Sequence, residues 1–256
     1  LFEQQCMGRC GARATKALGV RARGSGTGWD IGPELTRVLA WLQHYFATVP
    51  HRAVSFGEAE RPVVLPTDSA FEDGTATCGG RIIDGTRREM FGVTLPETIT
   101  RSRLAGRGFK QCIGQVELIP MWICRELWPA LLRRRRVLWF IDNDSARFAL
   151  IGMYSPSQAS TEILEAIATQ ELALQTLSWC ARVASLANIG DGPSRLKFDE
   201  AAELGFVRIC ADSALDKCVS LFGTKCEHAY VCIYIGLGLW VLVFIKILVL
   251  SFPFYK

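Results

Sequence analysis

Four acidic residues have the side-chain type and the sequence context of metal ligands. Asp68 and Asp142 each follow a short apolar run, Glu117 lies in an apolar stretch between them, and Asp191 stands just before a predicted helix. Carboxylate oxygens are the ligands that Mg²⁺ prefers in proteins. Several carboxylates converging on one point can hold two divalent ions, an arrangement that hydrolyses phosphodiesters. The sequence therefore predicts a catalytic two-metal site at Asp68, Glu117, Asp142 and Asp191.

The elements that would position these acids indicate an α/β fold. Asp84-Gly85 is a strong hairpin signal, and an antiparallel hairpin followed by strands alternating with helices implies a mixed sheet flanked by helices. Its first three strands are expected to be antiparallel and the later ones parallel. The predicted elements are strands 63–67, 79–83 and 88–95, a helix over 113–132, a strand over 137–141, helices over 144–152 and 160–178, a strand over 179–183 and a helix after Pro193.

This arrangement would bring Asp68 and Asp142 together. Each acid is predicted to end a strand, and ends of neighbouring parallel strands meet at one sheet edge, where open α/β sheets bind ligands. Taken singly, Asp68 or Asp191 is more commonly a turn or N-cap residue, so the prediction depends on the set. Pro66 lies in a predicted strand, where its missing N–H is unfavourable. Pro120 and Pro129 lie in the predicted helix and are expected to kink it.

The chain of 256 residues divides into four predicted parts. Residues 1–54 are basic and Gly-rich, with one helix that Pro33 begins and Pro50 ends. Residues 55–207 form the predicted α/β domain, and 208–228 form a linker. Residues 229–250 form a predicted transmembrane helix, since 229–245 contain no formal charge and the apolar stretch is long enough to cross a bilayer. The alternative is that this stretch is translated non-coding sequence or a wrongly predicted exon.

The cysteines and the N-terminus indicate an intracellular protein, membrane-associated if the span is real. The ten cysteines have no CxxC pair or zinc-finger spacing, and several stand in apolar surroundings typical of small core residues. A reducing compartment fits this pattern. Residues 1–28 lack the apolar run of a secretory signal.

Four motifs, in this order, resemble ribonuclease H domains, and the last resembles those linked to reverse transcriptases in retrotransposons. The resemblance covers about residues 61–207. The motifs are Thr67-Asp68-Ser69-Ala70 followed by Gly79-Gly80-Arg81-Ile82-Ile83-Asp84, Ile113-x-x-x-Glu117-Leu118, Phe140-Ile141-Asp142-Asn143, and Asn188-x-x-Asp191-x-x-Ser194-Arg195.

The resemblance implies a nuclease that cuts the RNA strand of an RNA–DNA hybrid with two Mg²⁺ or Mn²⁺ ions bound to the four acids. It also implies that residues 1–54 are the end of a reverse transcriptase connection segment. No histidine lies between Asp142 and Asp191, where cellular members usually carry one that helps product release. This departure, the prolines and the C-terminal span leave open a catalytically decayed domain that only binds nucleic acid, or a membrane-anchored protein of unknown role.

Basic residues indicate where a hybrid would bind. The net charge is only +4, but Arg101, Arg103, Arg107 and Lys110 stand together with no acid among them, and such clusters suit a polyanion. Asn143 and Arg195 complete the expected nucleic-acid-binding set. Arg133–Arg136 form a second run after the predicted helix over 113–132, at the negative end of its dipole, where cations are favoured. The loop cations are therefore expected to matter more for binding. No protein partner is evident from the sequence.

One rival interpretation is a different enzyme. Asp142-Asn143-Asp144 after an apolar strand resembles the Asp-x-Asp metal motif of glycosyltransferases, and a membrane anchor would suit that class. Replacing Asp144 separates the two hypotheses, because the nuclease needs Asp142 and not Asp144.

Overall fold

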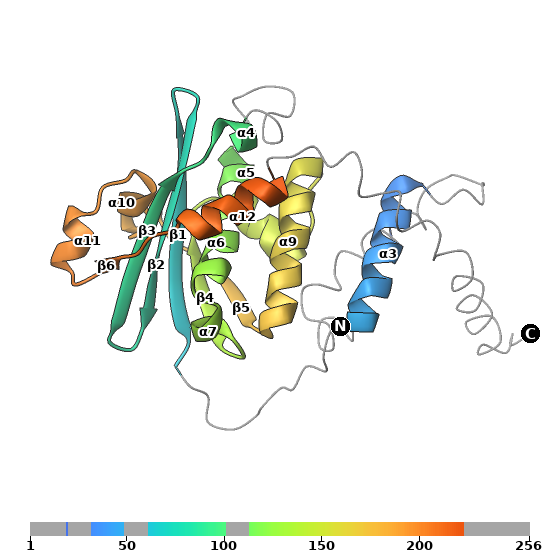
Figure 1. Cartoon of the computed structure of the whole chain (residues 1–256), viewed down its shortest axis with the longest axis horizontal. Helices are drawn as coiled ribbons and strands as arrows, with labels where there is room; N and C mark the ends of the chain where they lie inside the picture. Colours follow the sequence, from blue (N-terminus) through green and yellow to red (C-terminus); the bar gives the residue numbers. More distant parts are fainter. Residues whose placement is uncertain (1–18, 20–31, 49–60, 101–112, 223–256) are drawn as a thin grey trace, which may run out of the picture. The chain divides into compact units, whose positions relative to one another are not determined.

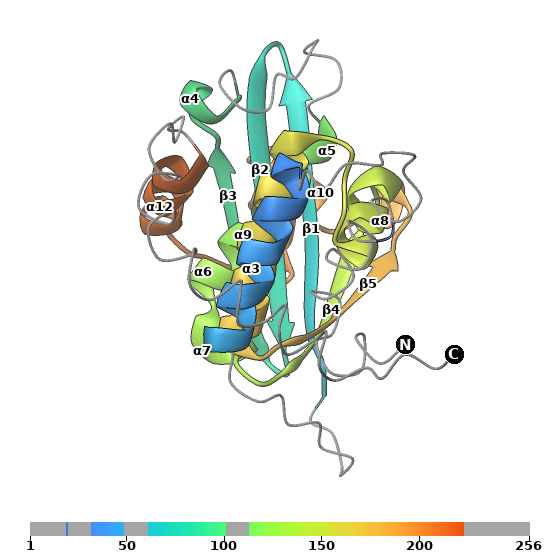
Figure 2. The same cartoon turned by 90° about the vertical axis from the view of Figure 1, so that its right-hand side faces the viewer.

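One mixed sheet organises the part of the chain that the computed structural model describes, which is residue 19 and residues 32–48, 61–100 and 113–222. The strand order is β5-β4-β1-β2-β3-β6, and Figure 2 shows the first five strands side by side. The predicted fold class, a mixed sheet with helices on it, is confirmed. The strands are β1 (Val63–Glu72), β2 (Thr75–Asp84), β3 (Arg87–Thr94), β4 (Arg136–Ile141), β5 (Leu177–Arg182) and β6 (Val207–Arg208).

Tight turns make the first three strands antiparallel. Asp73 and Gly74 join β1 to β2 with φ of 50° and 79°, and Gly85 joins β2 to β3 with φ of 62°. Two-residue loops of this left-handed kind match the twist of the strands that they connect. Parallel pairing follows where helices connect the strands, since β1 pairs with β4 and β4 with β5 in parallel.

Helices cover both faces of the sheet (Figure 1). The short helices α10 (Asp191–Ser194) and α11 (Asp199–Glu203) lie on one face, and α10 packs on β1, β2 and β3. The other face carries most of the helices and the main hydrophobic core, which includes Trp139 and Leu65. The remaining helices are α3 (Pro33–Thr48), α4 (Glu97–Ile99), α5 (Ile113–Val116), α6 (Ile119–Leu127), α7 (Pro129–Leu132), α8 (Asp144–Gly152), α9 (Gln158–Leu174) and α12 (Asp212–Phe222).

A buried cation joins three elements within the core. Arg125 of α6 lies 3.3 Å from Glu171 of α9 and 4.4 Å above the ring of Trp139 in β4. Buried charges are tolerated when they are paired in this way. The pair and the ring together fix α6, which follows Glu117 in the chain.

The predicted continuous helix over 113–132 is wrong. The segment is three helices, α5, α6 and α7, and a proline stands in the first turn of both α6 and α7. Proline lacks the N–H that a helix interior needs, but this loss is harmless in the first turn. Glu117 therefore lies in the turn between α5 and α6 rather than one turn into a helix.

The prediction that Asp68 ends its strand is also wrong. The strand β1 continues to Glu72, and Asp68 pairs with Gly79 of β2 in its middle. The pairing between β1 and β2 is interrupted at Leu65 and Pro66. On its other side, Pro66 lies opposite Phe140 of β4. The missing N–H of proline is thus accommodated by a local gap in one ladder.

The end of the domain is also more divided than predicted. A single helix was expected after Pro193, whereas α10, α11, β6 and α12 follow one another there. The helix predicted from Pro33 is present as α3, and its Arg37 lies 3.5 Å from Glu165.

The predicted transmembrane helix over 229–250 lies outside the described residues. Among the residues that are described, no helix is both long enough and apolar enough to span a bilayer. The membrane segment stays a prediction.

Candidate metal centre

Three of the four predicted carboxylates meet at one point. Asp68, Glu117 and Asp142 each offer an oxygen, and these oxygens lie within 4.8 Å of one another. They come from the middle of β1, from the α5–α6 turn and from the residue that follows β4. Because β1 and β4 are adjacent and parallel, the prediction that Asp68 and Asp142 lie close together holds even though Asp68 is not at a strand end.

The three carboxylates are held together against their mutual repulsion. Burial, then the charge of Asp142, raises the pKa of Asp68 to about 6. Burial raises the pKa of Glu117 well above its usual range, and the charges of Asp68 and Asp142 add to it. Hydrogen bonds from the Ser69 backbone oppose both shifts. Clustered like charges in a buried site lower their free energy by taking up protons or a cation.

The donor set fits a divalent metal ion. All three groups are hard oxygen ligands, which Mg²⁺ and Mn²⁺ accept. Asp142 Oδ1 is buried and has no hydrogen-bond partner among the described residues. A buried acceptor without a partner costs free energy unless an ion or water satisfies it. The structure thus supports Asp68, Glu117 and Asp142 as residues that can hold a metal.

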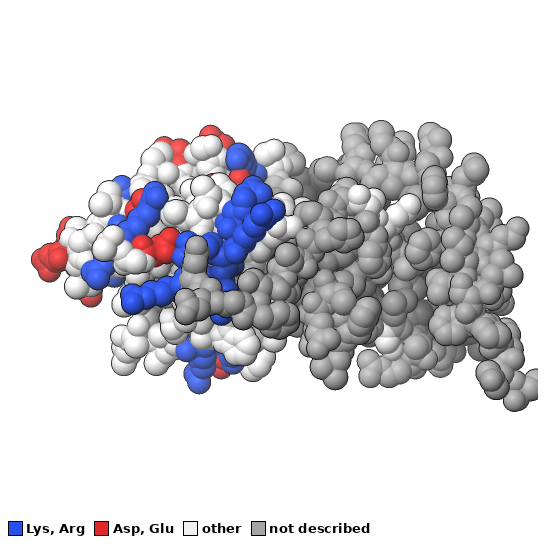
Figure 3. All heavy atoms as spheres, turned by 90° about the horizontal axis from the view of Figure 1, so that it is seen from below, with Lys and Arg blue, Asp and Glu red and all other residues white. Residues whose placement is uncertain are grey.

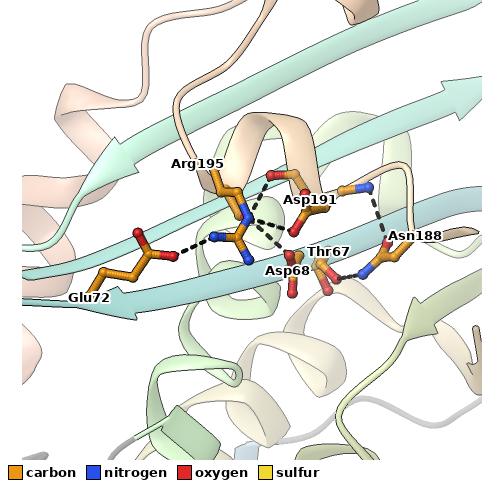
Figure 4. Close-up of polar contacts among 8 residues, drawn as sticks. Thr67, Asp68, Glu72, Asn188, Asp191 and Arg195 are labelled. Carbon is orange, nitrogen blue, oxygen red and sulfur yellow. Dashed lines mark hydrogen bonds and ion pairs between the residues drawn. The ribbon is translucent and has the colours of Figure 1, made fainter. Parts of the chain in front are cut away.

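The segment after β5, which includes α10, contacts Asp68 directly. The Ser194 hydroxyl lies 2.9 Å from Asp68 Oδ2 and 2.8 Å from the Asp191 carbonyl, and its one proton can serve one of them at a time. Asn188 fixes the same segment to β1, because its amide nitrogen donates to the Thr67 carbonyl at 3.1 Å and its amide oxygen accepts from Gly190 N at 3.0 Å. Figure 4 shows Asn188, Thr67 and Asp68 side by side.

Two glycines allow α10 to lie directly on the sheet. A Cβ on Gly79 would lie 2.5 Å from the Pro193 carbonyl carbon, and one on Gly92 would lie 2.3 Å from the Pro193 oxygen. Only glycine permits backbone to approach this closely. Helix α10, which carries Asp191 and Ser194, can therefore lie close to Asp68 because Gly79 of β2 and Gly92 of β3 have no side chain.

Asp191 does not belong to the three-residue cluster but lies beside it. Its charge raises the pKa of Asp68 slightly, and its own carboxylate pairs with Arg195 at 2.8 Å. Arg195 also pairs with Glu72, so that one guanidinium lies between two carboxylates (Figure 4). Both carboxylates and Arg195 are at least 41% exposed, and exposed pairs of this kind are weak.

The other predicted residues fall into three groups. Asn143 caps α8, because its side chain accepts from Ala146 N at 3.0 Å. Asp144 pairs with Arg147 at 2.8 Å and Arg182 at 3.6 Å, so it stands apart from the carboxylate cluster. The loop cations Arg101, Arg103, Arg107 and Lys110 lie outside the described residues.

Sequence reasoning did not assign roles to Ser194, Asn188 and Glu72. Asn188 and Ser194 stand three residues on either side of Asp191, in the fourth motif of the sequence analysis. Their spacing was therefore a usable signal. Glu72 carries no such signal, because it reaches Arg195 only through the extension of β1 beyond Asp68.

The stability of the metal-free protein should depend on the charge of Asp68. Folding raises the pKa of Asp68 from 3.8 to about 6. Protonated Asp68 therefore contributes fully to the stability of the folded protein below pH 3.8, and this contribution is lost as the pH rises through about 6. We expect Asp68→Asn to be more stable than the wild type by about 3 kcal/mol at pH 7 in EDTA. The advantage should vanish near pH 4. Urea unfolding across this pH range measures it, and a pH-independent difference would contradict the assignment.

Comparisons with known proteins add the following findings. No protein-family model matches the sequence, and no curated protein matches it. Solved structures that match the chain include ribonuclease H1 from Halobacterium salinarum, at 13% identity over 55% of this chain and 99% of that chain, with a TM-score of 0.39. The N-terminal ribonuclease H domain of a Mycobacterium tuberculosis protein matches at 16% identity over 56% and 98%, with a TM-score of 0.38. A ribonuclease H1 from compost, isolated by a metagenomic approach and solved in complex with an RNA/DNA hybrid, matches at 12% identity over 55% and 99%, with a TM-score of 0.38.

Proposed function

We propose that this chain is a divalent-metal-dependent endonuclease of the ribonuclease H type, which cleaves the RNA strand of an RNA–DNA hybrid. The observation that carries the proposal is the convergence of Asp68, Glu117 and Asp142, whose ligand oxygens lie within 4.8 Å of one another. The buried Asp142 Oδ1 has no hydrogen-bond partner in the described part of the chain. The resemblance of the surrounding motifs to ribonuclease H domains gives the reaction and its substrate.

Each residue of the site has a part that its contacts support. Asp68, Glu117 and Asp142 hold the metal, and Asp191 supplies a further carboxylate beside them. Bound Mg²⁺ or Mn²⁺ would activate water and stabilise the leaving oxygen, with two ions as the expected number. Ser194 and Asn188 are positioning residues, because they connect Asp68 and its strand to the segment that carries Asp191.

Arg195 contacts an acid of the site and is also proposed to bind the hybrid. Its pairs with Asp191 and Glu72 are exposed, and an exposed pair costs little to break. Because a planar guanidinium binds phosphate oxygens well, Arg195 can exchange a carboxylate for a phosphate of the bound hybrid. The loop cations Arg101, Arg103, Arg107 and Lys110 and the polar Asn143 are proposed to contact the same backbone.

The decisive experiment uses the full chain and a hybrid labelled on its RNA strand. We expect cleavage in Mg²⁺ or Mn²⁺ and none in EDTA, and no cleavage of a DNA duplex of the same sequence. Hybrid binding without cleavage in either metal would instead favour the decayed domain. Neither binding nor cleavage would contradict the proposal.

Two finer proposals concern origin and location. The motif from Asn188 to Arg195 supports descent from a retrotransposon reverse transcriptase, with residues 1–54 as the end of its connection segment. The uncharged stretch 229–245 supports attachment of the domain to an intracellular membrane. Carbonate extraction of membranes from cells that express the full chain, compared with a chain ending at residue 222, tests the second proposal.

A further inference from the structure

Seven arginines gather at the end of the sheet opposite Asp142. We call this group the arginine pole. The strands β1 and β4 begin at this end, and the β2–β3 hairpin turns there. Figure 3, which views the molecule from below Figure 1, shows Lys and Arg side chains spread over this face with few acids between them. The group consists of Arg61, Arg87, Arg88, Arg133, Arg134, Arg135 and Arg136.

Hydrogen bonds and strand register connect neighbouring members of the arginine pole. Arg135 Nη2 donates to the Arg61 carbonyl at 3.0 Å and to Asp84 Oδ1 at 3.0 Å. Asp84 lies opposite Arg87 in the β2–β3 register. Arg136 begins β4 next to Arg135, so the group extends from the hairpin across β1 to the start of β4.

Most of these cations have no carboxylate partner in the part of the chain that the structure describes. Asp84 pairs with Arg135 at 3.0 Å, and Glu89 pairs with Arg87 at 2.7 Å. Among the described residues, no ion pair is formed by the other members, which are Arg61, Arg88, Arg133, Arg134 and Arg136. The whole chain carries only +4. Five arginines at one end without a carboxylate partner among the described residues therefore create a local positive field that the net charge does not reveal.

Capping of α9 explains only part of the group. Arg133 Nη1 donates to the Ala173 carbonyl at 3.4 Å, and one cation is enough to favour a helix C-terminus. The backbone N–H of Arg134 donates to the Leu174 carbonyl at 2.8 Å, which needs no side chain. Arg134 also has a φ of 58°, a left-handed conformation that glycine adopts more easily. The arginine side chain is therefore not needed by the local backbone.

We propose that the arginine pole is a second nucleic-acid-binding surface, which contacts the phosphodiester backbone and is separate from the metal centre. All seven members are arginine, whose planar fork binds phosphate through two parallel hydrogen bonds. Backbone contacts of this kind do not depend on base sequence. The surface would hold a nucleic acid without metal, since it lies at the opposite end of β4 from Asp142.

The test compares two double variants of the full chain that lose the same charge. Arg134→Gly with Arg136→Gln removes two pole cations, and the glycine suits the left-handed backbone. Lys197→Gln with Lys217→Gln removes two exposed lysines outside the pole as the matched control. Affinity for a labelled RNA–DNA hybrid and a labelled DNA duplex is measured in EDTA across a salt series. We expect the pole variant to flatten the log–log salt slope by about two units for both duplexes, and the control to leave it unchanged.

Several outcomes would overturn the inference. An unchanged slope in the pole variant, or an equal loss in both variants, would show an ordinary solvated surface. Loss of binding to phosphatidylserine vesicles with duplex binding intact would assign the pole to a membrane instead. Equal thermal unfolding of the two variants excludes a folding defect. These results are independent of cleavage, so a failure of the proposed nuclease activity would be recognised separately.

Discussion

Asp142→Asn should abolish hybrid cleavage, by about 10³-fold or more, and leave the protein folded. The amide keeps the shape of the side chain but loses the charge that attracts a divalent ion. The same change should stabilise the metal-free protein, because the charge of Asp142 raises the pKa of both Asp68 and Glu117. Single-turnover cleavage and thermal unfolding in EDTA measure the two effects.

Asp144→Asn is the matched control for that variant. Asp144 lies two residues further along and pairs with Arg147 and Arg182 rather than with the cluster. We expect it to retain cleavage within a few-fold of the wild type. If Asp144→Asn were inactive and Asp142→Asn active, the Asp-x-Asp interpretation would replace the nuclease.

Gly79→Ala should displace α10 and reduce both stability and cleavage. The new Cβ would lie within 2.8 Å of three backbone atoms of Pro193 and Ser194, and backbone cannot yield as a side-chain end can. Overpacking of this kind costs roughly 1–3 kcal/mol. A shift of about 1 Å in catalytic geometry can cost roughly 10²-fold in rate, so we expect a loss of cleavage of that size. Urea unfolding and cleavage rates are the measurements.

Gly80→Ala provides the comparison on the opposite face of β2. Its Cβ would meet side-chain atoms of Phe91, Thr67 and Cys124 at 3.1–3.3 Å, which can move by a few tenths of an ångström. We expect a smaller loss of stability and little change in cleavage per folded molecule. Equal effects of the two substitutions on cleavage would show that the position of α10 does not matter for the site.

The sequence predicted the fold where the local signals are strong. Asp84-Gly85 predicted the β2–β3 hairpin, and the apolar run before Asp142 predicted a strand with that residue at its end. These signals are short-range, because a turn conformation or a buried strand is encoded within a few residues. The order of elements then placed the strand that carries Asp68 beside the strand that Asp142 follows, as observed.

The details that escaped prediction depend on contacts between distant residues. The length of β1 beyond Asp68 is set by pairing with β2, where Glu72 lies opposite Thr75, and strand ends are poorly encoded locally. The second partner of Arg195 could not be predicted either. Arg195 stands four residues from Asp191 on the motif, yet its second partner, Glu72, comes from β1.

The location of Asp68 in the middle of β1 has a consequence for how the site opens. Strand β1 pairs with β4 over Val63–Pro66 and with β2 at Asp68 and beyond. Amides near Asp68 should therefore exchange with solvent hydrogen only when this central part of the sheet unfolds. Asp191 instead begins the four-residue helix α10, which can detach in a smaller fluctuation. Asp68 and Asp191 are thus held by elements of different local stability. Helix α10 can detach and carry Asp191 away while Asp68 stays in place.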